Sequence, residues 1–366
     1  MSEHVTVLEI NAQAVLHNLD YFKRKLNANT KILAVVKAFG YGSESVEIAK
    51  ILHNRVDYFA TAYTHEAITL RNAGIKTPIL ILHPQLQNIE LITDYYLEPA
   101  LYNFKIFDAF LKLADQKYLL NYPIHIKFNT GLNRLGFTHL AIPALVALLK
   151  KSNNIKVKSV FSHLAASEDL NELEFSNNQI GSFVSIAKQL IRLLKYRPLV
   201  HILNTSGVIN YNKAQFDMVR IGIGLYGFGN HPEQTEKLKN THTLKSIISQ
   251  IHFVKAGETI GYNRAFTANR PTKSATIPIG HADGISRKLG NKNGFVLIDG
   301  QWAPIIGNVC MDMIMADVTD INCEEGDQVI IFKHQQHIEQ ISQKCETIPY
   351  EILTAISQRI KRVIKM

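Results

Sequence analysis

Short apolar runs alternate with amphipathic stretches between about residue 30 and residue 225. The stretch from Ser43 to Leu52 is typical of the amphipathic ones, because its apolar residues recur at helical spacing. The apolar runs are often β-branched, which predicts strands buried on both faces. Eight such runs are present: KILAVVK ending at Lys37, DYFAT from Asp57, PILIL from Pro78, EPALY from Glu98, PIHIKFN from Pro123, IKVKSVFSH from Ile155, LVHILN from Leu199 and DMVRIG from Asp217. Eight strands alternating with helices favour a (β/α)8 barrel, although a doubly wound α/β sheet gives a similar alternation.

The pattern of apolar and polar residues changes from about residue 240, where strand-like runs are separated by Gly and Asn turns. Examples are TLKSIISQIHFV, SATIPIG, FVLIDG, APIIGNV, MIMADV and QVIIF, and long helical patterns are absent until Ile348. We therefore predict an α/β protein with a barrel over residues 1–235 and a mostly β domain over residues 236–366. The boundary is expected in the polar stretch Gly227–Asn240, and residues 1–10 are a candidate strand for the second domain.

Composition narrows the functional classes. The chain has 366 residues, of which 46% are hydrophobic and 19% charged, which is enough for one large and one smaller core. The net charge is +9, but the Lys and Arg are mostly scattered and no RNA-binding or zinc-ligand motif accompanies them, so we expect neither a nucleic-acid partner nor a metal. The three cysteines lack C-x-x-C spacing, and there is no export signal or membrane-length apolar run. These features predict a cytoplasmic protein without a membrane partner.

Polar side chains gather at the C-terminal ends of the predicted barrel strands. In a parallel barrel this end carries the functional groups, so the concentration predicts a site. The residues are Lys37, Lys127, Asn129, Arg134, His163, His201, Asn204 and Arg220.

Lys37 follows the apolar run ILAVV directly. Burial at a strand end would lower the lysine pKa and favour the free amine that a Schiff base needs. Taken alone, the residue is better interpreted as a lysine that extends to the barrel rim.

The surrounding segment AVVKAFGYGS resembles the cofactor-lysine motif of alanine racemases. Further segments match that family in the same order along the chain, which makes the resemblance specific. They are HIKFNTGLNRLGF, FSHLAASED, HILNTSG, DMVRIGIGLYG, GYNRAF, IPIGHADG, GNVCMDMIMADVT and TIPYEILTAISQRIKRV. The resemblance implies a TIM-like barrel, pyridoxal 5′-phosphate (PLP) as cofactor, interconversion of L- and D-alanine to supply D-alanine for peptidoglycan, and a homodimer with shared active sites.

The resemblance also implies two catalytic bases. Lys37 would bind PLP and act on one face of the substrate, and Tyr262 of the other subunit would act on the opposite face. Tyr262 needs activation, because an ordinary tyrosine pKa is near ~10. Without the resemblance, Tyr262 would be interpreted as a tyrosine packed on a strand.

Other cofactor contacts are implied in the same way. Arg220 would face the pyridine nitrogen and leave it largely unprotonated, while His163 positions the guanidinium and His201 supports it. The phosphate would be bound by hydroxyl groups and by backbone N–H groups beside a glycine. The matching cofactor positions are Lys37, Tyr41, His163, Asn204, Thr205, Arg220, Gly222, Ile223 and Tyr350.

Substrate contacts complete the implied site. Arg134 would lie near the phenolic oxygen of PLP, and the backbone of Met311, with Asp312 beside it, would bind the substrate carboxylate across the dimer interface. Lys127 matches a lysine that is often carbamylated in the family, which would relieve repulsion between adjacent cations. The aspartate of that motif is Asn129 here.

Two departures leave the specificity open. His281 replaces a usual tyrosine at the substrate entrance, and Asn308 replaces a usual arginine. A serine or broad-specificity racemase is therefore an alternative, and a non-catalytic PLP-binding protein is an alternative of another class that would lack the β domain. A D-threonine aldolase would need a metal site, and a basic amino-acid decarboxylase would need a Cys–Asp motif that CMD at Cys310 only faintly resembles.

Overall fold

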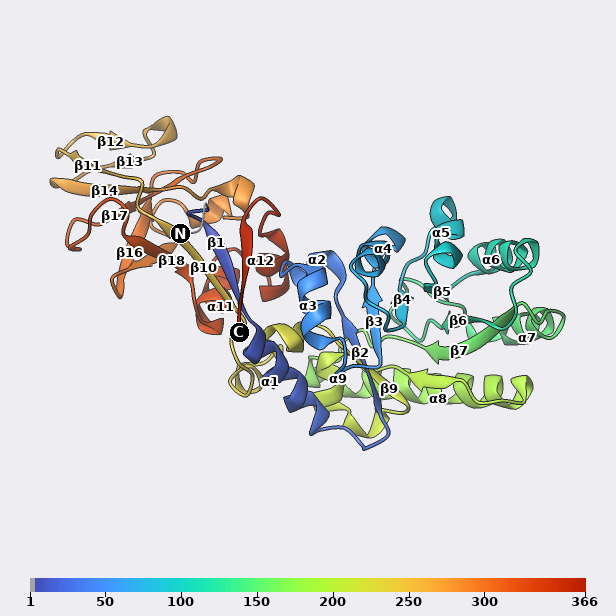
Figure 1. The fold of residues 1–366 in the computed structure, drawn as a ribbon. Helices are drawn as coiled ribbons and strands as arrows, with labels where there is room; N and C mark the ends of the chain where they lie inside the picture. The colour runs from blue at the N-terminus through green and yellow to red at the C-terminus, as the bar shows by residue number, and fades with distance from the viewer. Residues whose placement is uncertain (1–3) are drawn as a thin grey trace.

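The computed structural model describes residues 4–366 as two lobes joined side by side (Figure 1). One lobe is built on an eight-stranded parallel sheet with the order β8-β7-β6-β5-β4-β3-β2-β9. Its strands are β2 (Lys31–Val35), β3 (Tyr58–Thr61), β4 (Ile79–Ile81), β5 (Glu98–Leu101), β6 (Tyr122–Lys127), β7 (Ile155–Phe161), β8 (Leu199–His201) and β9 (Met218–Ile221). Each strand lies in one of the eight predicted runs, and the continuous order confirms the barrel over the doubly wound alternative, whose strand order reverses.

The barrel closes between β8 and β9 without a regular ladder. Asp217 N donates to Val200 O at 3.1 Å, and Arg220 N donates to Leu203 O at 3.0 Å. The Asp217 carboxylate also accepts from Val200 N at 2.8 Å. These bonds bring the end of β9, which carries Arg220, against the end of β8.

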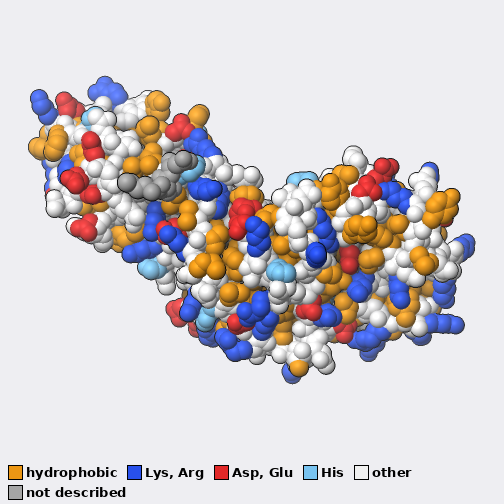
Figure 2. Space-filling model, in the orientation of Figure 1, with side chains coloured by type: hydrophobic (Ala, Val, Ile, Leu, Met, Phe, Trp, Pro, Cys, Tyr) orange, Lys and Arg blue, Asp and Glu red, His pale blue; other side chains and the backbone are white. Residues whose placement is uncertain are grey.

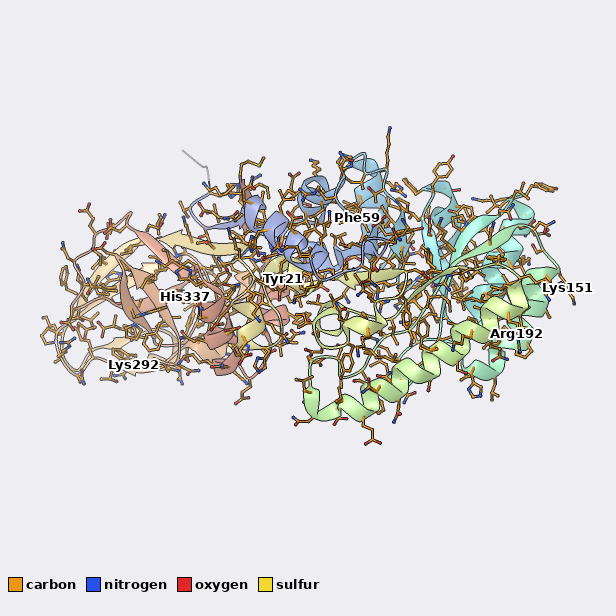
Figure 3. The ribbon with its side chains drawn as sticks, turned by 90° about the horizontal axis from the view of Figure 1, so that it is seen from below. Tyr21, Phe59, Lys151, Arg192, Lys292 and His337 are labelled. Atoms are coloured by element: carbon orange, nitrogen blue, oxygen red, sulfur yellow. The ribbon has the colours of Figure 1, made fainter. Side chains whose placement is uncertain are left out.

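Helices cover the outside of the barrel because each presents one apolar face. In the helix that follows β5, Asn103 caps the first turn by accepting from Ile106 N, and Phe107 and Phe110 are buried against the strands. Figure 3 shows the longest helix on the outer surface with Arg192 exposed, whereas Phe59 lies inside the lobe. The helices are α1 (Ala12–Lys23), α2 (Lys37–Tyr41), α3 (Ser45–Leu52), α4 (Thr64–Asn72), α5 (Ile89–Asp94), α6 (Phe104–Gln116), α7 (Ile142–Lys150), α8 (Leu173–Leu194) and α9 (Thr205–Asn210).

The second lobe contains a nine-stranded sheet with the order β11-β14-β17-β16-β15-β18-β10-β1-β19. Strand β1 pairs antiparallel with β10 and parallel with β19, so the first strand of the chain lies in this lobe. Residues 1–3 of the candidate strand lie outside the described residues, and the domain boundaries stay a prediction. The strands are β1 (Val7–Asn11), β10 (His242–Ile247), β11 (Gln250–Val254), β14 (Thr272–Ile277), β15 (Phe295–Ile298), β16 (Gln301–Ile306), β17 (Ile314–Asp317), β18 (Gln328–Phe332) and β19 (Lys361–Lys365), with β12 (Thr259–Ile260) and β13 (Phe266–Thr267) as a separate pair.

The expectation of no helix in this region before Ile348 was wrong. Besides the short α10 (Pro232–Thr235) and the expected α12 (Pro349–Ala355), helix α11 spans Gln335–Lys344. Its sequence, QQHIEQISQK, offers only Ile338 and Ile341 at helical spacing, which is too weak an apolar pattern to predict a helix.

The lobes meet through the segment that follows Lys37. Gly42 has φ +81°, and a Cβ there would lie 2.1 Å from Leu353 O of α12. Arg362 Nε donates to Gly42 O at 2.9 Å, which ties the same turn to β19. Figure 2 shows a notch between the lobes and, on the visible face, Lys and Arg intermixed with Asp and Glu. Across residues 4–366, no helix has the length and apolar character needed to cross a membrane.

Candidate active site

A cavity of about 500 Å³ lies where the barrel strands end. This volume is in the usual range of small-molecule sites. Eleven predicted residues line it: Lys37, Tyr41, Lys127, Arg134, His163, Asn204, Thr205, Arg220, Gly222, Ile223 and Tyr350. The structure therefore brings these eleven residues together, whereas the predicted strand-end residues Asn129 and His201 do not line the cavity.

Lys37 is presented by an unusual left-handed turn. The φ angles are +51° at Ala38, +55° at Phe39, +62° at Gly40 and +54° at Tyr41. A left-handed conformation costs about 1–2 kcal/mol for each residue with a Cβ, and such strain is concentrated at functional sites. The sequence indicated only a glycine-containing loop here.

Glu66, on α4, holds this turn in place. One carboxylate oxygen accepts from Ala38 N at 2.7 Å, and the other accepts from Ala62 N at 2.7 Å and Tyr63 N at 3.1 Å. Burial and the neighbouring Arg134 lower the pKa of Lys37, while Glu66 opposes the effect. The net effect favours the neutral amine at the cavity wall.

Arg220 is buried and held by four acceptors. Its Nη1 donates to His201 Nδ1 at 2.7 Å, and its Nη2 donates to Ser162 O at 2.8 Å, Ile202 O at 2.8 Å and His163 Nδ1 at 3.0 Å. Burial lowers the pKa of Arg220 to about 9, so the guanidinium stays protonated at neutral pH. Burial and Arg220 lower the pKa of both histidines well below its ordinary value, so both are neutral acceptors.

Lys127 lies in the same wall, over the Phe161 ring at 5.8 Å from its centroid. Burial lowers the pKa of Lys127 to about 8, with further contributions from neighbouring cations. Asn129 is turned toward its own loop: its Oδ1 accepts from Gly131 N at 3.1 Å and Asn133 N at 3.0 Å. The amide therefore shapes the loop that leads to Arg134 and adds no negative charge beside Lys127.

Hydroxyl groups and a glycine form another part of the cavity wall. Thr205 Oγ1 accepts from Gly222 N at 3.1 Å. A Cβ on Gly222 would lie 2.4 Å from the Tyr41 hydroxyl, so only glycine permits this approach. Tyr350 OH accepts from Asn230 Nδ2 at 3.1 Å, and burial raises the pKa of Tyr350 to about 12.

Asn204 caps a helix as well as lining the cavity. Its Oδ1 caps α9 by accepting from Gly207 N at 2.9 Å and also accepts from Ser167 Oγ at 2.8 Å. Asn204 therefore lines the cavity while fixing the start of the helix that carries Thr205.

The remaining predicted residues lie in the other lobe. Tyr262, Met311 and Asp312 line a separate cavity of about 1140 Å³, and Tyr262 is 72% exposed. Within one chain they are not part of the cavity around Lys37. Asn308 Nδ2 donates to Tyr262 O at 3.1 Å, so this departure from the family motif now holds the Tyr262 backbone. The carboxylate of Asp312 accepts from Arg359 Nη2 at 2.7 Å.

Four further residues of the site were missed in the sequence. Tyr63, His83 and Phe161 line the cavity, with Phe161 beneath Lys127 and Arg220, and Glu66 anchors the lysine turn from outside the cavity lining. Tyr63 and His83 each lie two residues beyond a strand end, so a stricter search of all eight strand ends would have found them. Across the described residues, no group of three or more His, Cys, Asp or Glu is placed to hold a metal ion, and the expected absence of a metal stays a prediction.

The fold and the cavity define a barrel enzyme with a reactive lysine and a buried arginine at the C-terminal end of the strands. Residues 10–230 match the sequence model of the alanine racemase N-terminal domain, and residues 241–364 match that of the C-terminal domain. The chain is 35% identical to alanine racemase 1 of Caldanaerobacter subterraneus, over 98% of this chain and 94% of that protein. It is similar to the solved alanine racemase of Clostridium difficile 630 (TM-score 0.93, 31% identity, 100% of this chain and 97% of that one).

A second solved relative is the alanine racemase of Bartonella henselae with covalently bound pyridoxal phosphate. It has a TM-score of 0.89 and 30% identity, over 99% of this chain and 100% of that one. The chain belongs to the alanine racemase family. The predicted isomerase class and PLP cofactor are thereby confirmed, and the family implies alanine as substrate.

Proposed function

We propose that the cavity around Lys37 holds PLP and racemises alanine with the residues described above. The observation that carries the proposal is that four basic side chains, Lys37, Lys127, Arg134 and Arg220, line one cavity. The carboxylate of Glu66 already accepts three backbone hydrogen bonds. Like charges repel when buried, so the site favours an anionic ligand. A phosphorylated aldehyde fits this basic cavity and a lysine whose pKa is lowered by burial.

PLP, when bound, supplies an electron sink that makes the α-proton of an amino acid acidic. Lys37 would hold the cofactor covalently, and its neutral Nζ would take or return the α-proton on one face. The left-handed turn and the Glu66 anchor fix where this Nζ lies. Arg134 would help to orient the substrate, because its cation lines the same cavity.

Arg220 would meet the pyridine nitrogen through Nε. Its hydrogen bonds within residues 4–366 use Nη1 and Nη2, and none uses Nε. A fixed guanidinium donates and does not deliver a full proton, which keeps the ring nitrogen largely unprotonated. His163 and His201 would hold the guanidinium in this orientation.

The phosphate would bind where Tyr41, Thr205 and Tyr350 bring hydroxyl groups to the cavity. The absence of a side chain at Gly222 lets the Tyr41 hydroxyl approach, and the Gly222 N–H, which now donates to Thr205 Oγ1, would turn to the phosphate. The residues proposed for this role are Tyr41, Thr205, Gly222, Ile223 and Tyr350, with Asn204 as support.

Lys127 is proposed to be carbamylated. With a pKa of about 8, a larger fraction of this amine is unprotonated at neutral pH than for an ordinary lysine. The unprotonated amine is the form that adds carbon dioxide. The modification would turn a cation into an anion beside Arg134 and Arg220. That change would compensate for the negative charge that Asn129 lacks.

The second base is proposed to come from another copy of the chain. Tyr262 lies outside the Lys37 cavity in a single chain, and it is part of an exposed apolar surface. Phe253 is 82% exposed, Met311 59% and Met313 47%. Exposed apolar patches of this kind mark interfaces, so we propose a homodimer in which this surface closes the partner's cavity. None of the hydrogen bonds within residues 4–366 uses the Met311 N–H, which leaves it available for a substrate carboxylate.

The lysine assignment is tested with Lys37→Ala. The variant is expected to lose the visible absorbance band of lysine-bound PLP and to lose racemisation. Lys31→Ala, an exposed lysine at the other end of the same strand, is the matched control. Retention of bound PLP and full turnover in Lys37→Ala would refute the assignment.

Active-site sharing is tested by mixing inactive Lys37→Ala and Tyr262→Phe subunits. A mixed dimer contains one site with both bases intact, so re-equilibrated equal mixtures should recover about a quarter of wild-type activity. No recovery from subunits that demonstrably exchange would contradict the shared site.

A panel of L-amino acids assayed for D-product distinguishes alanine from serine or broad specificity. The non-catalytic alternative is disfavoured because the β domain is present.

We also propose a reducing, cytoplasmic setting. Cys310, Cys323 and Cys345 form no disulfide with one another. The role in supplying D-alanine for peptidoglycan and the absence of a nucleic-acid partner stay predictions.

A further inference from the structure

A continuous chain of buried hydrogen bonds leads away from Arg220 through the interior of the barrel. Arg220 Nη1 contacts His201 Nδ1 at 2.7 Å, and His201 Nε2 contacts Ser159 Oγ at 2.9 Å. Ser159 Oγ in turn contacts His125 Nδ1 at 2.6 Å. The side chains come from the neighbouring strands β9, β8, β7 and β6, and His201, Ser159 and His125 have no exposed surface.

The chain continues to the far end of the barrel. His125 Nε2 contacts Glu98 Oε2 at 2.8 Å on β5, and Tyr58 OH donates to the same oxygen at 3.1 Å from β3. Glu98 and Tyr58 line a second cavity, of about 810 Å³, where the strands begin. The chain of bonds therefore joins the active-site end of the barrel to its opposite end.

Arg220 at one end and Glu98 at the other determine which atom donates in each hydrogen bond of the chain. An arginine can only donate, so His201 Nδ1 must accept, and the proton of this neutral ring is on Nε2. Ser159 then accepts from His201 and donates to His125 Nδ1, which places the His125 proton on Nε2, facing Glu98. An ionised carboxylate can only accept, so all the donors are consistent from Arg220 to Glu98.

Reversing the far end would leave the middle of the chain unsatisfied. If the Glu98 carboxyl donated to His125 Nε2, His125 Nδ1–H would donate to Ser159 Oγ, which would then accept from both histidines. The Ser159 proton would have no acceptor within the chain, and a buried donor without a partner is costly. A Glu98 that accepts from His125 therefore keeps Ser159 fully bonded and gives the His201 Nε2–H a fixed acceptor.

A purely structural role would not require this arrangement. Burying an ionised carboxylate is unfavourable, and apolar side chains of similar volume usually stabilise a core as well or better. We propose that Glu98, His125 and Ser159 are positioning residues that hold the His201 ring through its Nε2–H and thereby fix the orientation of Arg220. The consequence for catalysis rests on the proposed role of Arg220, whereas the hydrogen bond to His201 does not.

The test uses holoenzyme carrying Ser159→Ala, which interrupts the chain, and Glu98→Leu, which is of similar size and offers His125 no acceptor. Tyr58→Phe is the matched control, because it removes a donor to Glu98 outside the chain. Ring ¹⁵N spectra of histidine-labelled enzyme report the tautomers, with His125 and His201 signals assigned from His125→Gln and His201→Gln. Steady-state kinetics report kcat and KM in both directions.

We expect Ser159→Ala and Glu98→Leu to shift the His201 Nε2 signal, because its hydrogen bond is lost or weakened, and to lower kcat by about tenfold with KM nearly unchanged, the size of one hydrogen bond to a charged group. Tyr58→Phe should leave both readouts near wild type. Wild-type-like His201 signals in folded Ser159→Ala and Glu98→Leu would overturn the proposal. If the wild type did not racemise alanine, the proposed function would fail, while the ring ¹⁵N spectra would still test the hydrogen-bond chain.

Discussion

Replacement of Lys127 by methionine is expected to stabilise the protein in the absence of bicarbonate. Burial lowers the pKa of Lys127 from 10.5 to about 8. That difference corresponds to roughly 3 kcal/mol of stability, because each pKa unit is worth ~1.36 kcal/mol. Methionine is about as long as the aliphatic part of lysine and carries no charge, so Lys127→Met removes this penalty.

The pH dependence has a definite sign. Between pH 8 and 10.5 the unfolded chain binds more protons at this lysine than the folded chain, so stability rises with pH across that window. The penalty is complete below pH 8 and absent above 10.5. The advantage of Lys127→Met should therefore be largest near pH 7 and shrink toward pH 10.

Carbamylation adds a second signature. Bicarbonate should stabilise the wild type near pH 8 by converting the cation into an anion, and it should leave Lys127→Met unchanged. Thermal unfolding at fixed protein and PLP concentrations measures both effects, since each kcal/mol moves the Tm by roughly 2–4 °C for domains of this size. Lys158→Met, an exposed lysine on β7, is the matched control.

One result would refute the burial penalty at Lys127, and another would refute its carbamylation. Equal Tm values for wild type and Lys127→Met at pH 7 without bicarbonate would show that the buried lysine carries no penalty. An equal response of both proteins to ¹³C-labelled bicarbonate, with no carbamate signal specific to the wild type by ¹³C NMR, would exclude the modification.

Two further predictions concern the lobes and the tyrosine loop. Gly42→Ala should lower the Tm more than Gly74→Ala. Both glycines have positive φ, but only the Cβ added at Gly42 would collide with Leu353 O, at 2.1 Å. Equal losses of Tm would mean that this contact is unimportant. Asn308→Ala should lower kcat about fivefold without loss of bound PLP, because it removes one hydrogen bond to the Tyr262 backbone. Asn293→Ala serves as its control, and unchanged kinetics would contradict the positioning role of Asn308.

The barrel could be predicted from the sequence because its strands are local and nearly continuous apolar runs. The strand-end rule likewise located Lys37, Lys127 and Arg220, because the C-terminal ends of parallel strands converge at one end of the barrel. The left-handed turn after Lys37 could not be predicted, since its φ angles are imposed by distant Glu66 and α12.

The hydrogen-bond chain from Arg220 to Glu98 could not be predicted from the sequence for a related reason. Glu98 is the one charged residue of EPALY, and Ser159 is one of several polar residues in IKVKSVFSH, so neither stands out in runs that were interpreted as buried strands. Their pairing depends on which side chains point inward once the sheet curves and closes. That is a property of the closed barrel, and no local pattern reports it.

The pairing of β1 with β19 has a consequence for the order of folding. All eight barrel strands have been synthesised once residue 221 is reached, so the barrel can form while the ribosome is still working, and Tyr350 completes the Lys37 cavity later. The other lobe begins earlier in the chain, with β1, yet its sheet waits for residues 361–365. A truncation of those few residues would therefore leave the barrel strands intact while exposing an edge of β1 to other chains.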